Sequence, residues 1–341
     1  MGMVGGYRPQ LDGLRAVAVT LVLLGHFALD RTVIGHVGVR IFFVLSGYLI
    51  TGILLQARDA REAGQAQPLR HFYIRRILRL WPAYYLLLGV ALIANIDNIR
   101  SVAPWHLVQA SNILFAWRNA FVPPVTAHWW SLAVEEQFYL VWPLVVFFLP
   151  RRWLVPAIIA AIGMANVGRA FIPMDDIAYL TLPFMSFDAL AAGALVTVAE
   201  RRGPMPGWLL PGTLLLGAIT LVVLLLPLPF GLNLHLSEAL TAPLFAGLVA
   251  LAASGRTPSW LGRVLCWPPI LYIGRISYGV YLYHLFILLA MWKLDETAAF
   301  LAHHRMVMFL IGSAATIIVA TASWYMIERP INALKRRYPF P

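Results

Sequence analysis

The sequence contains a single cysteine, Cys266, among its 341 residues. An intrachain disulfide is therefore impossible, and a metal site built from several thiolates cannot form. Two motifs are also missing, the H-E-x-x-H pattern of zinc hydrolases and the Walker pattern of ATP-binding loops. We therefore expect no metal site, no tightly bound cofactor and no ATP-driven transport by this chain.

Charged side chains are scarce, at 12% of the residues, whereas hydrophobic ones make up 60%. This balance excludes an ordinary soluble globular protein. In a soluble protein the formal net charge of +11 would suggest a nucleic-acid partner. In a membrane protein the same excess is typical of cytoplasmic loops. We therefore expect a lipid bilayer as the environment and no nucleic acid as a partner.

Ten apolar segments are long enough to cross a bilayer, which predicts an all-α, polytopic membrane helix bundle of about ten transmembrane helices. They lie near residues 14–30, 37–56, 77–95, 130–149, 153–172, 178–199, 209–230, 235–254, 270–292 and 306–327. We find no cleavable signal peptide, no internal repeat and no separate soluble segment. The prediction is one integral membrane domain over residues 1–341, located in the cytoplasmic (inner) membrane and crossing it many times.

The basic residues predict the orientation of the spans. With the N-terminus in the cytoplasm, sixteen of the 26 basic residues fall in inside segments, five in outside loops and five within spans. Inside loops of membrane proteins collect Lys and Arg. Both termini are therefore predicted to be cytoplasmic.

Two ionisable residues, Arg15 and His26, interrupt the first apolar run, LRAVAVTLVLLGHFALD (residues 14–30). A separation of eleven residues on an α-helix returns the second side chain to nearly the same face, about 16 Å further along the axis. One residue lies near the start of the run and the other deep inside it. Such groups are costly at membrane depth and so indicate function. Neutral His26 can take a proton from a hydroxyl, although a structural histidine inside the bundle is the alternative.

A second cluster of basic residues opens the third predicted span, in FYIRRILRLWPAYY (residues 72–85). Arg76 and Arg79 are three residues apart and share a helix face. Arginine binds phosphate oxygens well through its planar fork. The alternative is membrane anchoring by the positive-inside bias, which we favour for Arg75.

Two further groups of polar residues lie within predicted spans. In HWWSLAVEEQFYLVWP (residues 128–143), Glu135 and Glu136 are adjacent, so we expect at most one to face a given site. That glutamate either orients an imidazole or forms a structural ion pair with Arg40 or Arg275. Further along, Tyr281 and His284 are three residues apart and either face a polar cavity or belong to aromatic packing. Asp188 is also within a span, and the sequence suggests no partner for it.

At these residues the chain resembles the acyltransferase type 3 family of integral membrane O-acyltransferases. Five segments carry the resemblance, in the order the family has them and over most of the chain. They are RPQLDGLRAVAVTLVLLGHF, VGVRIFFVLSGYLIT, FYIRRILRLWPAYY, HWWSLAVEEQFYLVWPL and ISYGVYLYHLFIL. The family pattern of Arg, ten residues and His falls on Arg15 and His26. The R-x-x-R pattern falls on Arg76 and Arg79, and W-S-L-x-V-E favours Glu135 over Glu136.

The resemblance implies transfer of an acyl group, usually acetyl from acetyl-CoA, to a hydroxyl of a cell-surface glycan or a hydrophobic natural product. His26 and Glu135 would be catalytic, with His26 as general base or as a transiently acylated relay, and with Glu135 either orienting His26 or stabilising its charged form. Arginines 15, 76 and 79 would bind the acyl-CoA phosphates, and Tyr281 and His284 the acceptor.

Some members of this family carry an added hydrolase-like domain at the C-terminus, which this sequence does not show after KRRYPFP. Either a separate periplasmic transferase is a partner for a later transfer step, or the integral domain suffices. The alternative function is a transporter or flippase for an acyl or glycan substrate, which would use the same intramembrane charges for translocation.

Overall fold

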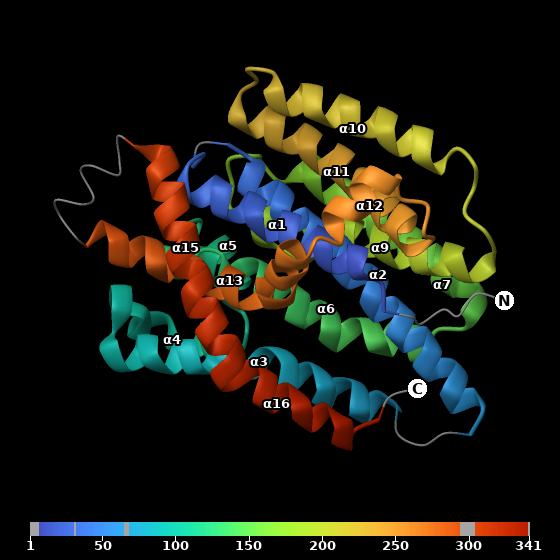
Figure 1. Cartoon of the computed structure of the whole chain (residues 1–341), viewed down its shortest axis with the longest axis horizontal. Helices are drawn as coiled ribbons and strands as arrows, with labels where there is room; N and C mark the ends of the chain where they lie inside the picture. Colours follow the sequence, from blue (N-terminus) through green and yellow to red (C-terminus); the bar gives the residue numbers. More distant parts are fainter. Residues whose placement is uncertain (1–6, 31, 65–67, 294–303, 340–341) are drawn as a thin grey trace. The chain divides into compact units, whose positions relative to one another are not determined.

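The fold is all-helical over the residues that the computed structural model describes, which are 7–30, 32–64, 68–293 and 304–339, and no strand occurs in these ranges. The long helices are α1 (Pro9–Phe27), α2 (Ile34–Glu62), α3 (Pro68–Ala94), α6 (Trp129–Phe148), α7 (Arg151–Phe171), α9 (Phe187–Arg202), α10 (Leu209–Leu225), α11 (Phe230–Ala253), α13 (Pro268–Trp292) and α15 (Arg305–Ser323). Figure 1 shows them in sequence colours. This confirms the predicted fold class.

Short helices fill the connections between the long ones. They are η1 (Ile96–Val102), α4 (Ala103–Leu107), α5 (Ser111–Arg118), η2 (Pro124–Thr126), α8 (Ala178–Thr181), η3 (Pro183–Ser186), α12 (Ser259–Leu265), η4 (Trp324–Glu328), α16 (Arg329–Ala333) and η5 (Leu334–Arg337). The element η4 is a single π-helical stretch that continues directly from α15.

Each of the ten predicted spans coincides with helical structure. Within the described ranges, 9 helical segments are long and apolar enough to cross a membrane, and α10 is a shorter apolar helix of 17 residues. The predicted span 178–199 is broken, because α8 ends at Thr181 and α9 begins at Phe187. Pro183 lies between them, and proline disfavours helix in the residue that precedes it. The side of the membrane on which each terminus lies stays a prediction.

The chain divides into two compact units. Unit 1 contains the described residues of 1–52, 151–175 and 184–277, and unit 2 those of 53–150, 176–183 and 278–341. Helices α2 and α13 each contribute residues to both units. The prediction of one acyltransferase domain over the whole chain stays a prediction.

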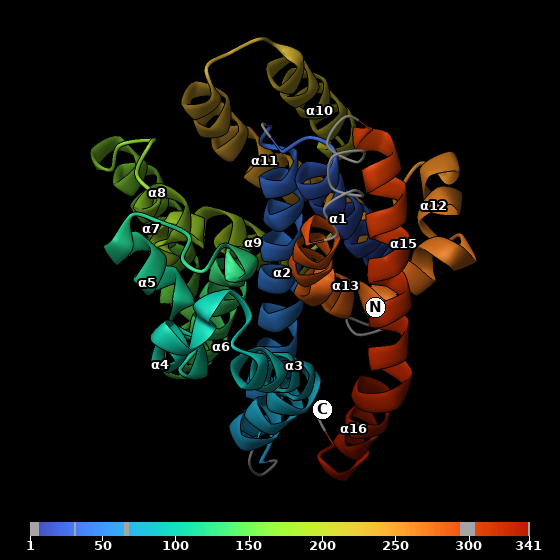
Figure 2. The ribbon, with the colours of Figure 1, turned by 90° about the vertical axis from the view of Figure 1, so that its left-hand side faces the viewer.

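In unit 1, helices pack through glycine contacts. Helix α9 lies beside α7 (Figure 2) and also packs on α11, while α10 runs alongside α11 (Figure 1). Where α2 meets α9, a Cβ added at Gly47 would overlap the carbonyl group of Leu190, and one added at Gly193 would overlap that of Val44. Small residues at such crossings let helix backbones approach closely, which is how membrane helices gain packing energy.

In unit 2, α3 packs along α16 and η4, and α5 packs on α6 and α8. Glu328 is the last residue of the π-helical η4 and is buried, and its side chain accepts a 3.1 Å hydrogen bond from the Ser323 hydroxyl. A Cβ added at Gly279 of α13 would lie 3.2 Å from the carboxylate of Glu328. A π-helical turn inside an α-helix is uncommon and is frequent at functional sites.

Candidate functional site

Helix α1 carries Arg15 and His26, and it lies in unit 1. The helix ends at Phe27, so His26 is in its last turn. The N–H groups of Ala28 and Leu29 both donate to the carbonyl oxygen of Leu24, at 3.0 and 2.8 Å, which closes the helix. The sequence predicts His26 deep inside an apolar run that continues to Asp30. Instead, the two ionisable residues lie toward opposite ends of α1.

The ring orientation of His26 is defined by its own helix. The imidazole is half-buried, and Nδ1 lies 2.9 Å from the carbonyl oxygen of Val22. A carbonyl oxygen only accepts, so Nδ1 carries the hydrogen and donates it. In the neutral ring the lone pair is then on Nε2. His26 therefore has the chemistry of a base at Nε2.

The first turn of α2 lies against the imidazole of His26. A Cβ added at Gly35 would be 3.6 Å from Cε1 and 3.7 Å from Nδ1 of His26. One added at Gly25 would be only 2.5 Å from the main-chain nitrogen of Gly35. Because neither glycine has a side chain, the backbones of α1 and α2 approach closely beside His26.

Arg15 is held only loosely at the other end of the helix. Its Nη1 lies 3.7 Å from Oδ1 of Asp12, and both side chains are 22% exposed. Tyr7 donates a 2.8 Å hydrogen bond to Oδ2 of the same carboxylate, and this bond raises the pKa of Tyr7. A long, partly exposed ion pair contributes little stability. The guanidinium of Arg15 therefore keeps its capacity to bind an anion.

The arginines of α3 belong to unit 2 and differ in their surroundings. Arg75 donates to the carbonyl oxygens of Lys335 and Tyr338, at 3.3 and 3.1 Å, and so anchors the C-terminal segment. The guanidinium carbon of Arg76 lies 5.6 and 5.9 Å from the ring centres of Phe72 and Tyr139. Such stacking orients an arginine without neutralising its charge.

Arg76 and Arg79 each lie near a carboxylate. Arg76 interacts electrostatically with Glu136, and Arg79 with Glu328. The indole of Trp81 is also hydrogen-bonded to Glu136. Both arginines are half-buried at the N-terminal half of α3. Both lie in one helix three residues apart, and their joint role in binding phosphate stays a prediction.

A small pocket in unit 2 brings both adjacent glutamates to one place. It is lined by Leu80, Tyr84, Gln109, Leu132, Glu135, Glu136 and Tyr278. Our expectation that at most one glutamate would face a site is wrong for this pocket. Adjacent helical positions differ by about 100°, and the pocket is lined by side chains of α3 and α13 in addition to those of α6. Glu135 and His26 belong to different units, so a role for Glu135 in orienting His26 stays a prediction.

Tyr84, which lines the pocket, is hydrogen-bonded to the main chain of a buried histidine. Tyr84 donates a 2.9 Å hydrogen bond to the carbonyl oxygen of His106 in α4. The His106 ring is fully buried against Trp129, with ring centres 5.1 Å apart. Burial lowers the pKa of His106 to about 4. The imidazole is therefore neutral at physiological pH.

Tyr281 and His284 are buried between α13 and α6 in unit 2, and neither lines the pocket. The Tyr281 hydroxyl lies 2.5 Å from the hydroxyl of Ser131 and donates to the carbonyl oxygen of His128 at 3.0 Å. Nδ1 of His284 donates to the carbonyl oxygen of Tyr281 at 2.6 Å. The rings of His128 and His284 are 4.6 Å apart. Within unit 2 these contacts correspond to the packing alternative that we left open.

Unit 1 contains a group of buried charges that sequence reasoning did not assemble. We call it the charge cluster and define it as Arg40, Arg169, Asp188 and Glu238. Arg40 donates to both oxygens of Asp188, at 2.7 and 2.5 Å, and contacts Glu238 at 2.9 Å. Arg169 contacts Asp188 at 2.9 Å and Glu238 at 2.5 Å. Each arginine thus contacts both carboxylates, and the formal charges balance.

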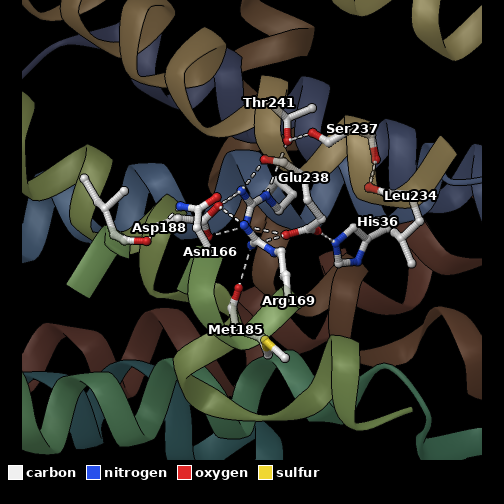
Figure 3. Close-up of polar contacts among 11 residues, drawn as sticks. His36, Asn166, Arg169, Met185, Asp188, Leu234, Ser237, Glu238 and Thr241 are labelled. Carbon is white, nitrogen blue, oxygen red and sulfur yellow. Dashed lines mark hydrogen bonds and ion pairs between the residues drawn. The ribbon is translucent and has the colours of Figure 1, made fainter. Parts of the chain in front are cut away.

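His36 extends the charge cluster toward α1. Its Nε2 donates to Oε1 of Glu238, as Figure 3 shows for the labelled side chains. The five residues come from α2, α7, α9 and α11, so the cluster joins four helices. Within unit 1, Asp188 has the partners that the sequence did not suggest, and Arg40 pairs with Asp188 and Glu238.

The sequence signalled Asp188 and Arg40, because an ionisable side chain inside an apolar run is rare, but the sequence analysis did not single out Arg169, Glu238 or His36. It gave no partners, since Arg40 is separated from Asp188 by 148 positions and His36 from Glu238 by 202. In the part of the chain that the structure describes, no group of three or more His, Cys, Asp or Glu side chains is placed to hold a metal ion.

Comparisons with known proteins point to one family. A family described as an acyltransferase domain matches residues 8–325. The chain is 32% identical to the peptidoglycan O-acetyltransferase OatA of Listeria monocytogenes, over 96% of this chain and 56% of that protein. It is 29% identical to the putative peptidoglycan O-acetyltransferase YrhL of Bacillus subtilis, over 96% of this chain and 55% of that one.

A putative O-acetyltransferase of Staphylococcus aureus is 27% identical, over 96% of this chain and 57% of its own length. The chain therefore spans little more than half the length of these curated relatives. No solved structure matches it.

Proposed function

We propose, from the premise that this chain belongs to the acyltransferase-domain family, that it moves an acetyl group from acetyl-CoA to a hydroxyl of a cell-surface glycan. The chain is a multi-pass membrane protein of a family of O-acetyltransferases. The names of its relatives favour peptidoglycan as the acceptor over a hydrophobic natural product. We place it in the cytoplasmic membrane, where donor and acceptor lie on opposite sides.

The observation that carries the proposal is the fixed ring of His26. Nε2 holds the lone pair because Nδ1 donates to the carbonyl oxygen of Val22. In the proposed reaction Nε2 takes the proton of the acceptor hydroxyl as its oxygen attacks the thioester carbonyl. The carbon–sulfur bond then breaks, and the CoA sulfur leaves and receives the proton. The products are an acetyl ester and free CoA thiol.

Arginine supplies the proposed recognition of the donor. In unit 1, Arg15 has only a weak ion pair with Asp12, so its guanidinium group can bind a phosphate. In unit 2, Arg76 and Arg79 lie on one face near the N-terminal end of α3. The R-x-x-R pattern supplies two planar guanidinium groups, and each can contact two phosphate oxygens. With the N-terminus in the cytoplasm, Arg15 lies toward the side that holds acetyl-CoA.

The pocket that contains Glu135 and Glu136 supplies a second group of polar side chains. Its two carboxylates, two phenols and one amide accept and donate hydrogen bonds, which is the chemistry that a hydroxyl or water molecule needs. We propose that Glu135 and Glu136 assist proton movement in unit 2. A structural role for Tyr281 and His284 is favoured over acceptor binding by their burial.

The test uses purified protein in liposomes with acetyl-CoA on one side and a soluble peptidoglycan fragment on the other. A transferase releases CoA thiol in proportion to acetyl ester, which mass spectrometry detects on the glycan. The alternative of a transporter or flippase predicts movement of the substrate without thiol release. Movement of intact acetyl-CoA or glycan, with no ester formed, would overturn the proposal.

A further inference from the structure

We propose that the charge cluster of unit 1, acting through His36, is a positioning device for the imidazole of His26. This inference rests on the proposed function, in which His26 is the base of acyl transfer. It assigns a role to residues that do not touch substrate.

The first step is the contact between His26 and the first turn of α2. The main chain at Gly35 lies where an added Cβ would be 3.6 Å from the ring of His26. The backbone of Gly25, the neighbour of His26, is in turn packed against Gly35. Any shift of the α2 N-terminus therefore changes the space beside the imidazole. His26 has one further restraint in its own helix, the bond from Nδ1 to Val22.

The second step is the restraint on that first turn. Helix α2 begins at Ile34, so His36 is its third residue and directly follows Gly35. The ends of helices are the places where hydrogen bonding is incomplete and the backbone frays. Here the His36 side chain is bonded to Glu238 of α11, with side chains 13% and 5% exposed. This link fixes the first turn to another helix.

The third step is the rigidity of Glu238 itself. Its Oε2 contacts Arg40 at 2.9 Å and Arg169 at 2.5 Å, and its carbonyl oxygen accepts a 2.9 Å bond from Arg40. Asp188 is bonded to the same two arginines. Charge-assisted bonds of this kind are short and directional, and in a buried site they hold one geometry. Glu238 is therefore a fixed point for His36.

The arrangement separates positioning from folding. If His36 is lost, Oε1 of Glu238 loses that hydrogen bond, but the four charges of the cluster still pair with one another, so each buried charge keeps a partner of opposite sign. A substitution at His36 should therefore leave the bundle intact and change only how firmly the first turn of α2 is held. Catalysis is sensitive to such changes, because misplacing a reacting group by 1 Å can cost about 10²-fold in rate.

The experiment compares His36→Leu with His36→Gln in the purified full chain. Leucine cannot bond to Glu238, whereas the amide N–H of glutamine can replace Nε2–H of the histidine. We expect His36→Leu to lower kcat on the order of tenfold or more, with KM for acetyl-CoA within about twofold. We expect His36→Gln to recover most of the turnover. Gly52→Ala, whose Cβ would meet only the methyl group of Thr197 at 3.7 Å, is the control on α2.

A second variant tests the contact by another route. Gly25→Ala places a methyl group 2.5 Å from the backbone of Gly35 and forces the two helices apart beside His26. It should lower kcat in the same way without touching any charge. Melting temperature and monodispersity are measured for each variant.

Three results would overturn the inference: turnover of His36→Leu equal to wild type, equal losses in the leucine and glutamine variants, or a raised donor KM with unchanged kcat. Full turnover in His26→Ala would instead overturn the proposed function. The two failures are therefore distinguishable.

Discussion

Neutralising Asp188 should destabilise the protein far more than neutralising an exposed carboxylate. In Asp188→Asn the side chain keeps its size and loses its charge. The carboxylate that it replaces is 4% exposed and is contacted at 2.5, 2.7 and 2.9 Å by Arg40 and Arg169. After the change, two buried guanidinium groups share the single carboxylate of Glu238.

The magnitude follows from the unbalanced charge. Removing one partner of a buried ion pair leaves a charge without compensation, which costs about 3–5 kcal/mol. The comparison is Glu62→Gln, because Glu62 is 54% exposed and pairs with Arg58 on its own helix. Exposed pairs of this kind contribute less than about 1 kcal/mol. The two substitutions alter the same chemical group and differ chiefly in burial.

Both free energies of unfolding can be measured by reversible denaturation in mixed micelles, with helicity as the signal. We expect a difference of at least about 2 kcal/mol between Asp188→Asn and Glu62→Gln. If Asp188→Asn lost no more stability than Glu62→Gln, the charge cluster would hold no helices together. The double variant with Arg169→Met should recover part of the loss, because it restores the balance of charge.

Four more predictions concern residues outside the charge cluster. Arg79→Ala should raise KM for acetyl-CoA in steady-state assays, because it removes a guanidinium group that binds phosphate. Arg15→Lys should weaken binding of acetyl-CoA in titration calorimetry although the charge is kept, because lysine lacks the planar guanidinium group. His106 has a pKa of about 4 in the folded protein and about 6.5 when unfolded, so the unfolded chain takes up a proton first as the pH falls. Stability should drop by up to about 3 kcal/mol between pH 6.5 and 4, and His106→Asn should flatten that slope in denaturation curves. A cysteine at position 338, with Cys266 replaced, should escape an impermeant label in intact cells if both termini are cytoplasmic.

Hydrophobic periodicity and span length were sufficient to predict most of the fold. A membrane helix needs about twenty mainly apolar residues, and runs of that length can be recognised directly in the sequence. The exceptions are local. Pro183 breaks one span between Thr181 and Phe187, and α1 ends at Phe27 although apolar residues continue. Both depend on backbone geometry, which hydropathy does not report.

The candidate site could be predicted only in part. The spacing of Arg15 and His26 predicted a shared helix face. The tautomer of His26 could not be predicted, because it depends on the distance from Nδ1 to the carbonyl oxygen of Val22. The ion-pair partners of Asp188 could not be predicted from the sequence, because they come from helices far away along the chain. Glu328 was missed because it lies just beyond the last predicted span, 306–327, and its burial depends on the tertiary packing.

The central claim is that His26 carries the proton transfer of an acetyl-CoA-dependent O-acetyltransferase. The most direct measurement is the rate of CoA thiol release by the purified wild type and His26→Ala, with a peptidoglycan fragment as acceptor and mass spectrometry of the product. The account predicts thiol release matched by acetyl ester in the wild type, and a loss of about 10²–10⁴-fold in His26→Ala with unchanged melting temperature. Turnover of His26→Ala at the wild-type rate would contradict it.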